Sequence, residues 1–251
     1  MAKLGEAYSK AGETEVARAL FNQLVAGSRD DYALSGALGL DALDRASGTK
    51  PNEFDALRRA RVYLFNRHWP EARADLISIV ERFPDSPNRP EALYQTGFSF
   101  YREDLYDDAI KWFERAHAEF PNKKEGEQGY YWVATALQKA RRYDEAARRY
   151  ISFVDAYPRS DLVEGAYRNA ADALRYADKY SESIEWSRRI VTDFAGKPLA
   201  RFHAGSSRLP HHSRAGVPHP GHISRLRRWA ARENISPNQQ DERGGRPWMS
   251  A

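Results

Sequence analysis

The segment "RRYDEAARRYISFVDAYP", from Arg141 to Pro158, holds four arginines and four aromatic residues. It could be a basic helix that binds an anion, or one unit of a scaffold whose charges face water. Three relatives of it occur in the chain: "HWPEARADLISIVERFP", "LYDDAIKWFERAHAEFP" and "KYSESIEWSRRIVTDFA" end at Pro84, Pro121 and Ala195. Successive ends are 37 residues apart, so the segment is one copy of a repeat.

Each copy is predicted to be the second helix of a two-helix unit. The preceding segment places apolar residues at helical spacing, as at Leu93, Gly97 and Phe100. The second helix ends at the proline because proline cannot continue the hydrogen-bond ladder. One hairpin cannot bury its apolar face alone, so neighbouring units must stack. Small residues recur where the two helices of a unit cross, at Ala72, Ala109, Ala146 and Ser183.

These positions resemble the signature of the tetratricopeptide repeat, and the resemblance covers residues 1–29 and 53–197. The usual unit has about 34 residues, and the extra residues here lengthen the linker between units. The repeat and the resemblance together imply an all-α, right-handed solenoid of stacked antiparallel helix hairpins with a 37-residue period. The best-matching copy contains Leu93, Gly97, Phe100, Tyr106, Ala109, Phe113, Ala116 and Pro121.

A finer resemblance concerns the bacterial cell envelope. The linker "RFPDSPNRPEALY" is similar to that of envelope repeat proteins, and "YYWVATALQKARRYDEAARRY" with "TDFAGKPLA" resembles the superhelix of soluble lytic murein transglycosylases. This implies a periplasmic, non-catalytic scaffold for a protein or extended peptide, in association with peptidoglycan. The alternative is the N-terminal superhelical fragment of a peptidoglycan lytic transglycosylase that has lost its catalytic domain. The start of the chain lacks a signal-peptide apolar region, which leaves a cytoplasmic location open.

The chain is expected to have four parts. Residues 1–29 form a truncated first repeat, which begins three residues into its first helix. Residues 30–52 hold an extra helix, "DYALSGALGLDALDRA", and a loop. Residues 53–197 hold four repeats, and residues 198–251 form a tail that is disordered or frameshifted. The extra helix interrupts the alternation of first and second helices.

The tail has its own composition. After Lys197 the chain has nine arginines, no lysine and only three acidic residues. A frameshift, disorder without a dedicated role, and a basic arm for a polyanion all fit this composition. Because the tail has this excess of arginine, the net charge of +4 comes from the tail, and the repeat body is nearly neutral. We accordingly expect no nucleic-acid partner for the repeats.

No catalytic residue is predicted. The pair Glu182–Ser183 resembles the glutamate and serine of lytic transglycosylases, but Glu71, Asp108 and Glu145 occupy the same repeat position as Glu182. A repeated, solvent-facing acid lacks the apolar cleft that raises the pKa of a general acid. The sequence also has no phosphate-binding loop, dinucleotide fingerprint, zinc-protease motif or nucleophile elbow. We therefore expect a non-enzyme without a cofactor.

No metal site is predicted either. The chain has no cysteine. His211, His212, His219 and His222 are irregularly spaced among prolines, whereas a zinc site needs convergent ligands on an ordered frame.

The charges of the opening segment are expected to face water. Arg148 and Arg149 lie three and four residues after Glu145, spacings that allow weak ion pairs along one helix. The equivalents of Arg148 in other copies include Ala74 and Glu185, so no basic strip continues along the repeats.

The candidate binding site comes from the repeat architecture. In stacked hairpins the first helices line a concave groove, and their non-packing positions face a partner. Aromatic residues with a few hydrogen-bond donors suit a peptide or a partner's helix. An alternative is that some of these aromatic residues pack against neighbouring helices instead. The positions are Tyr94, Phe98, Tyr101, Tyr131, Thr135, Gln138, Arg168, Asp172 and Arg175.

Overall fold

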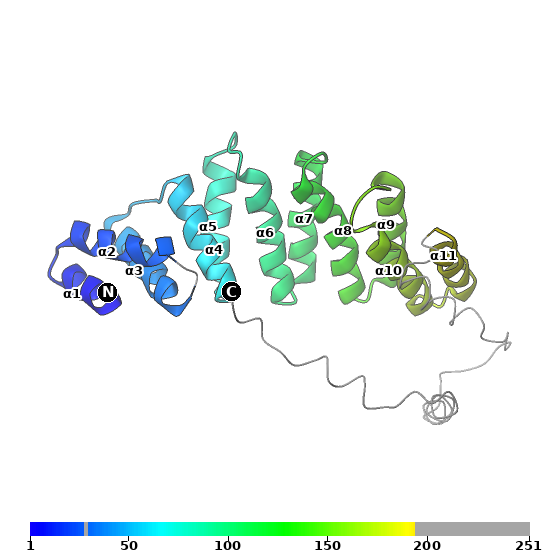
Figure 1. Cartoon of the computed structure of the whole chain (residues 1–251), viewed down its shortest axis with the longest axis horizontal. Coiled ribbons are helices and arrows are strands. Elements are labelled where there is room, and N and C mark those ends of the chain that lie inside the picture. The colour runs from blue at the N-terminus through cyan, green and yellow to red at the C-terminus, as the bar shows by residue number, and fades with distance from the viewer. Residues whose placement is uncertain (28–29, 194–251) are drawn as a thin grey trace, which may run out of the picture. The chain divides into compact units, whose positions relative to one another are not determined.

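The computed structural model describes residues 1–27 and 30–193, and every regular element in these ranges is an α-helix (Figure 1). The predicted tail and its histidines lie outside the described residues. The helices are α1 (Ala2–Lys10), α2 (Thr14–Gly27), α3 (Asp31–Ser47), α4 (Glu53–Phe65), α5 (Trp69–Arg82), α6 (Arg89–Arg102), α7 (Tyr106–Glu119), α8 (Lys124–Lys139), α9 (Tyr143–Ala156), α10 (Val163–Tyr176) and α11 (Tyr180–Asp193).

The helices form a row of antiparallel hairpins. In the repeats α4 pairs with α5, α6 with α7, α8 with α9 and α10 with α11, and each second helix from α5 to α9 also packs on the first helix of the next unit (Figure 1). The small crossing residues Ala72, Ala109 and Ala146 are fully buried. The all-α repeat fold predicted from the 37-residue period is confirmed. No helix in the described residues is long and apolar enough to cross a membrane.

The same turn links the two helices of every repeat. Arg67, Asp104, Arg141 and Asp178 each have a φ between 59° and 62° and stand 37 residues apart. After Arg141, the N–H of Arg142 donates to the carbonyl of Leu137, and the N–H of Arg141 donates to that of Gln138. These two bonds define a Schellman motif, which ends a helix with one left-handed residue.

We predict that Arg141→Gly stabilises the protein. A left-handed residue with a side chain costs more than glycine in the same turn, even after the extra entropy that glycine loses. The expected gain in the free energy of unfolding is about 0.5–1 kcal/mol, measured by urea denaturation. Arg141→Ala is the matched control, because it removes the same side chain but keeps the positive φ on a residue with a Cβ. An equal gain from alanine would contradict this explanation.

The arginines of the opening segment pair partly across units. Arg148 pairs with Asp144 at 3.0 Å, within its own helix. The spacing also allows Arg149 to pair within its helix, but Arg149 contacts Glu114 of α7 instead, at 2.6 Å. The long side chain of Arg149 reaches this carboxylate, 35 residues away on the second helix of the preceding unit. Asp144 and Lys179 make a similar link at 2.7 Å. Such exposed pairs each contribute little to stability.

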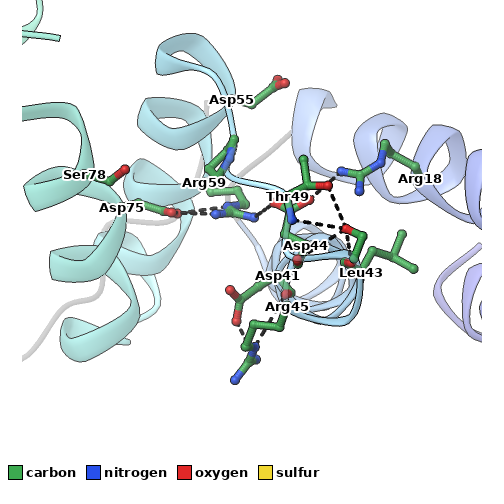
Figure 2. A network of polar contacts seen from close by, with 12 residues as sticks. Arg18, Asp41, Leu43, Asp44, Arg45, Thr49, Asp55, Arg59, Asp75 and Ser78 are labelled. Atoms are coloured by element: carbon green, nitrogen blue, oxygen red, sulfur yellow. Dashed lines mark hydrogen bonds and ion pairs between the residues drawn. The ribbon is translucent and has the colours of Figure 1, made fainter. Parts of the chain in front are cut away.

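A buried charge cluster joins the extra helix α3 to the repeats. Arg59 of α4 donates two hydrogen bonds to Asp75 of α5, at 2.9 and 2.5 Å, and one to Asp44 of α3 at 2.7 Å. Figure 2 shows Arg59 between these two carboxylates, and Arg18 of α2 also reaches Asp44, at 2.7 Å. Arg59, Asp44 and Asp75 are 3%, 5% and 6% exposed. Burial is the largest single effect and would lower the pKa of Arg59, but the hydrogen bonds to Asp75 and the charges of Asp75 and Asp44 act together to raise the pKa.

This cluster stands where the repeat pattern is interrupted. The positions equivalent to Arg59 in the next units hold Thr96, Val133 and Ala170, which are all buried without a charge. The side chain of Arg59 reaches over to α3, and α3 has few other contacts with α4. The ion pairs therefore join α3 to the repeats, together with an apolar cluster in which Leu40 and Leu43 of α3 belong with Tyr63 of α4.

Candidate functional site

The nine predicted site residues lie on three first helices. Three are on α6, three on α8 and three on α10, at equivalent positions one repeat apart. Arg168 and Arg175 are exposed, and the other seven are partly buried. The structure therefore brings the nine positions onto one side of the first helices, which we call the first-helix face.

Four aromatic residues form the apolar part of this face. Trp132 of α8 packs edge-on against Phe98 and Tyr101 of α6, with ring centroids 5.3 and 5.0 Å apart. Tyr94 stacks on Phe98 with 6.3 Å between centroids. We call Tyr94, Phe98, Tyr101 and Trp132 the aromatic shelf. All four rings are partly buried, so they pack on one another and still offer apolar surface.

The contacts of the aromatic shelf partly support the alternative prediction, that some of these aromatic residues pack against neighbouring helices. Tyr94 also contacts Phe113 of α7, at 5.7 Å between centroids, and Tyr101 contacts Tyr106 at 5.7 Å. Trp132 was not predicted, because its equivalents in the other units are Arg58, Gln95 and Asn169. The segment "GYYW", in which Trp132 follows two tyrosines, was the sequence feature that could have identified it as a site residue.

A row of polar groups lies beside the aromatic shelf. Tyr150, which reaches this row from the second helix α9, shares a hydrogen bond with Thr135 at 2.9 Å and donates to Gln138 at 3.1 Å. Asn169 of α10 donates to the hydroxyl of Tyr131 at 2.9 Å. Burial raises the pKa of both tyrosines, so they stay protonated at neutral pH and keep these bonds. Tyr150 and Asn169 were both missed by the sequence prediction.

The α10 end of the face carries charges of both signs. Asp172 pairs with Arg175 at 3.3 Å. The charge of Arg168 offsets part of the rise in pKa that burial causes at the Tyr131 hydroxyl. At the α6 end, Arg61 of α4 and Glu91 neutralise each other through two hydrogen bonds of 2.9 and 2.7 Å.

The acids considered for catalysis lie elsewhere. Glu71, Asp108, Glu145 and Glu182 all lie in the first turn of a second helix. A carboxylate there interacts favourably with the partial positive charge of the helix N-terminus. No group of histidine, cysteine, aspartate or glutamate in residues 1–27 and 30–193 could hold a metal ion.

Family models of the tetratricopeptide repeat match residues 57–123 and 134–198, and a second such model matches residues 2–26. The first model alone covers more than half of the 251 residues. The fold and its surface define a helical-repeat scaffold. The chain belongs to the tetratricopeptide-repeat family.

Solved structures of MamA share the fold. One MamA structure has a TM-score of 0.55 at 15% identity and covers 78% of this chain and 98% of its own. The RS-1 MamA ArsTM double mutant has a TM-score of 0.53 at 14% identity, covering 72% and 97%. MamA of MSR-1 has a TM-score of 0.52 at 13% identity, covering 76% and 99%. No curated protein matches the sequence.

Proposed function

We propose that the protein is a scaffold that binds another protein through the groove lined by its first helices. The aromatic shelf carries this proposal, since partly exposed tyrosine, phenylalanine and tryptophan beside hydrogen-bonding groups are the residues that anchor protein partners. Both surfaces carry ion pairs, such as Arg61–Glu91 on the first helices and Arg149–Glu114 on the second, so the aromatic shelf is the feature that favours the first helices.

Site-specific crosslinking tests the proposal. A photoreactive benzoylphenylalanine replaces Phe98 on the first-helix face or, as the control, Arg148 on the exposed side of α9. In an extract of the source cells we expect discrete protein adducts from position 98 only. Adding Trp132→Ala to the position-98 protein should reduce these adducts at least fivefold, because large aromatic side chains anchor protein interfaces and Trp132 packs against both Phe98 and Tyr101. Adducts from position 148 alone, or adducts insensitive to Trp132→Ala, would contradict the proposal.

Two finer predictions rest on resemblance alone. A periplasmic location with peptidoglycan association, and the alternative of a lytic transglycosylase fragment, have no support from the family models or the MamA structures. Both stay predictions.

A further inference from the structure

A cleft of about 330 Å³ opens beside the buried charge cluster. Its walls come from α2, α3 and α4 and from the loop that joins α3 to α4. Asp55 and Arg59 of α4 line it, and their equivalents in the next unit, Ala92 and Thr96, are fully buried. In that unit the preceding second helix, α5, packs on α6, whereas α3 packs less closely on α4. The cleft therefore lies where the repeat is interrupted.

Stability alone does not explain why charged residues line this cleft. Buried ion pairs are often no more stabilising than apolar residues of similar size, and the equivalents of Arg59 in later units are buried without a charge. Charged residues that are buried against the pattern of a fold are candidates for a functional site. Arg59 and Asp44, which lie side by side in Figure 2, therefore mark the cleft as a candidate binding site.

The cleft has one more positive than negative charge. Its charged lining residues are Arg18, Lys50, Arg59, Asp44 and Asp55. The ion-pair partners that lie just outside this lining are Arg58, beside Asp55, and Asp75, beside Arg59. These two partners add one charge of each sign, so the excess of one positive charge remains. A ligand with a single negative charge would balance it.

The acids of the cleft are already occupied. Both oxygens of Asp44 accept a hydrogen bond from an arginine, at 2.7 Å each. The oxygens of Asp55 accept one hydrogen bond from Arg58 and one from Asn52, at 2.9 Å each. A cationic ligand would therefore have to displace a cation or an amide that is already bound.

The hydrogen-bonding groups that are left over in the cleft are donors. The amide oxygen of Asn22 accepts from Arg58 at 2.8 Å, which leaves the amide N–H groups to donate. Arg18 bonds Asp44 through one nitrogen of its guanidinium, at 2.7 Å, and a guanidinium has five N–H groups. Lys50 is exposed on the loop and forms no ion pair among the residues that the structure describes. Charge and hydrogen bonding thus favour the same kind of ligand, an anion.

We propose that this cleft binds a small carboxylate with a short apolar body. The carboxylate accepts hydrogen bonds from Arg18, Lys50 and the amide of Asn22, and the apolar body lies against Leu40 and Pro51, which also line the cleft. Because the walls belong to α2, α3 and α4, the bound ligand stabilises the junction between α3 and the repeats. This site goes beyond the proposed function and does not depend on the groove of the first helices.

A ligand-observed NMR titration with sodium butyrate tests the proposal on the full 251-residue chain at constant ionic strength. We expect a dissociation constant of about 1–10 mM, as suits one carboxylate on a very small ligand. Butyramide keeps the apolar body without the charge, and butylammonium reverses the charge. Both should bind about tenfold more weakly than butyrate. Equal or tighter binding of either would overturn the proposal, as would the absence of butyrate binding up to about 50 mM.

Variants locate the binding within the cleft. Lys50→Glu should weaken butyrate binding about tenfold, because a donor is replaced by a repelling charge. Asn22→Asp should weaken it by about the same factor, because the donor amide becomes an acceptor beside Arg58. Lys123→Glu is the matched control on an exposed lysine next to α8, and it should change binding less than about twofold.

Equal weakening by Lys50→Glu and Lys123→Glu would show general attraction to positive charge and overturn the site. Thermal unfolding without butyrate should be the same for Lys50→Glu and the original protein, because this side chain is exposed and unpaired among the described residues. Weaker binding by a variant that is equally stable then reports on the cleft itself.

Discussion

Arg59→Ala is expected to lower the free energy of unfolding by about 3–5 kcal/mol, the largest effect that we predict. The substitution leaves Asp75 buried without a cation and leaves Asp44 with Arg18 as its remaining partner, and an uncompensated buried charge is costly. Urea denaturation followed by circular dichroism measures the change.

Two controls identify the cause. Arg61→Ala also removes an arginine from α4, but its pair with Glu91 is partly exposed, so a loss below about 1 kcal/mol is expected. Replacing the three charges together, with Arg59→Met, Asp44→Leu and Asp75→Leu, should recover much of the stability that Arg59→Ala loses, because no buried charge is then left uncompensated. Similar losses from Arg59→Ala and Arg61→Ala would contradict a buried cluster.

Gly126→Ala is expected to destabilise the protein by about 3 kcal/mol. A Cβ at this position would lie 1.9 Å from the carbonyl oxygen of Phe120 and 2.7 Å from its carbon. Both atoms belong to the backbone, so the close packing of α7 on α8 has to open. Because α8 carries Trp132, the same shift should also weaken partner binding. Thermal unfolding measures the loss of stability.

Gly27→Ala is the matched control, since nothing lies within 4 Å of its added Cβ. We expect a change within about 0.5 kcal/mol of the original protein, as for other substitutions that meet no neighbour. Equal destabilisation by the two alanines would show that the contact with Phe120 does not matter.

The fold was predictable because each unit repeats the same apolar pattern and most units end at a proline. Four copies 37 residues apart determine helix type, order and stacking without any single strong motif. The first-helix face was predictable for the same reason, since equivalent positions in successive units must share a side. Trp132 and Asn169 were missed because they follow the predicted positions by one residue and turn towards the neighbouring helix.

The buried charge cluster could not be predicted from the pattern. A charged residue in a repeat helix usually faces water, and Arg59 stands where later units hold Thr96 and Val133. Its partner Asp44 belongs to α3, which lies outside the repeat pattern, so no register relates the two. Such contacts depend on how a helix outside the repeat packs against the repeats, and the local sequence does not encode this packing.

Hydrogen exchange in complex with the partner captured through position 98 tests the central claim most directly. The account predicts slower exchange in residues 94–101 of α6 and 131–138 of α8, with α7 and α9 unchanged. Slower exchange confined to the exposed sides of α7 and α9, with α6 and α8 unchanged, would contradict binding through the first helices.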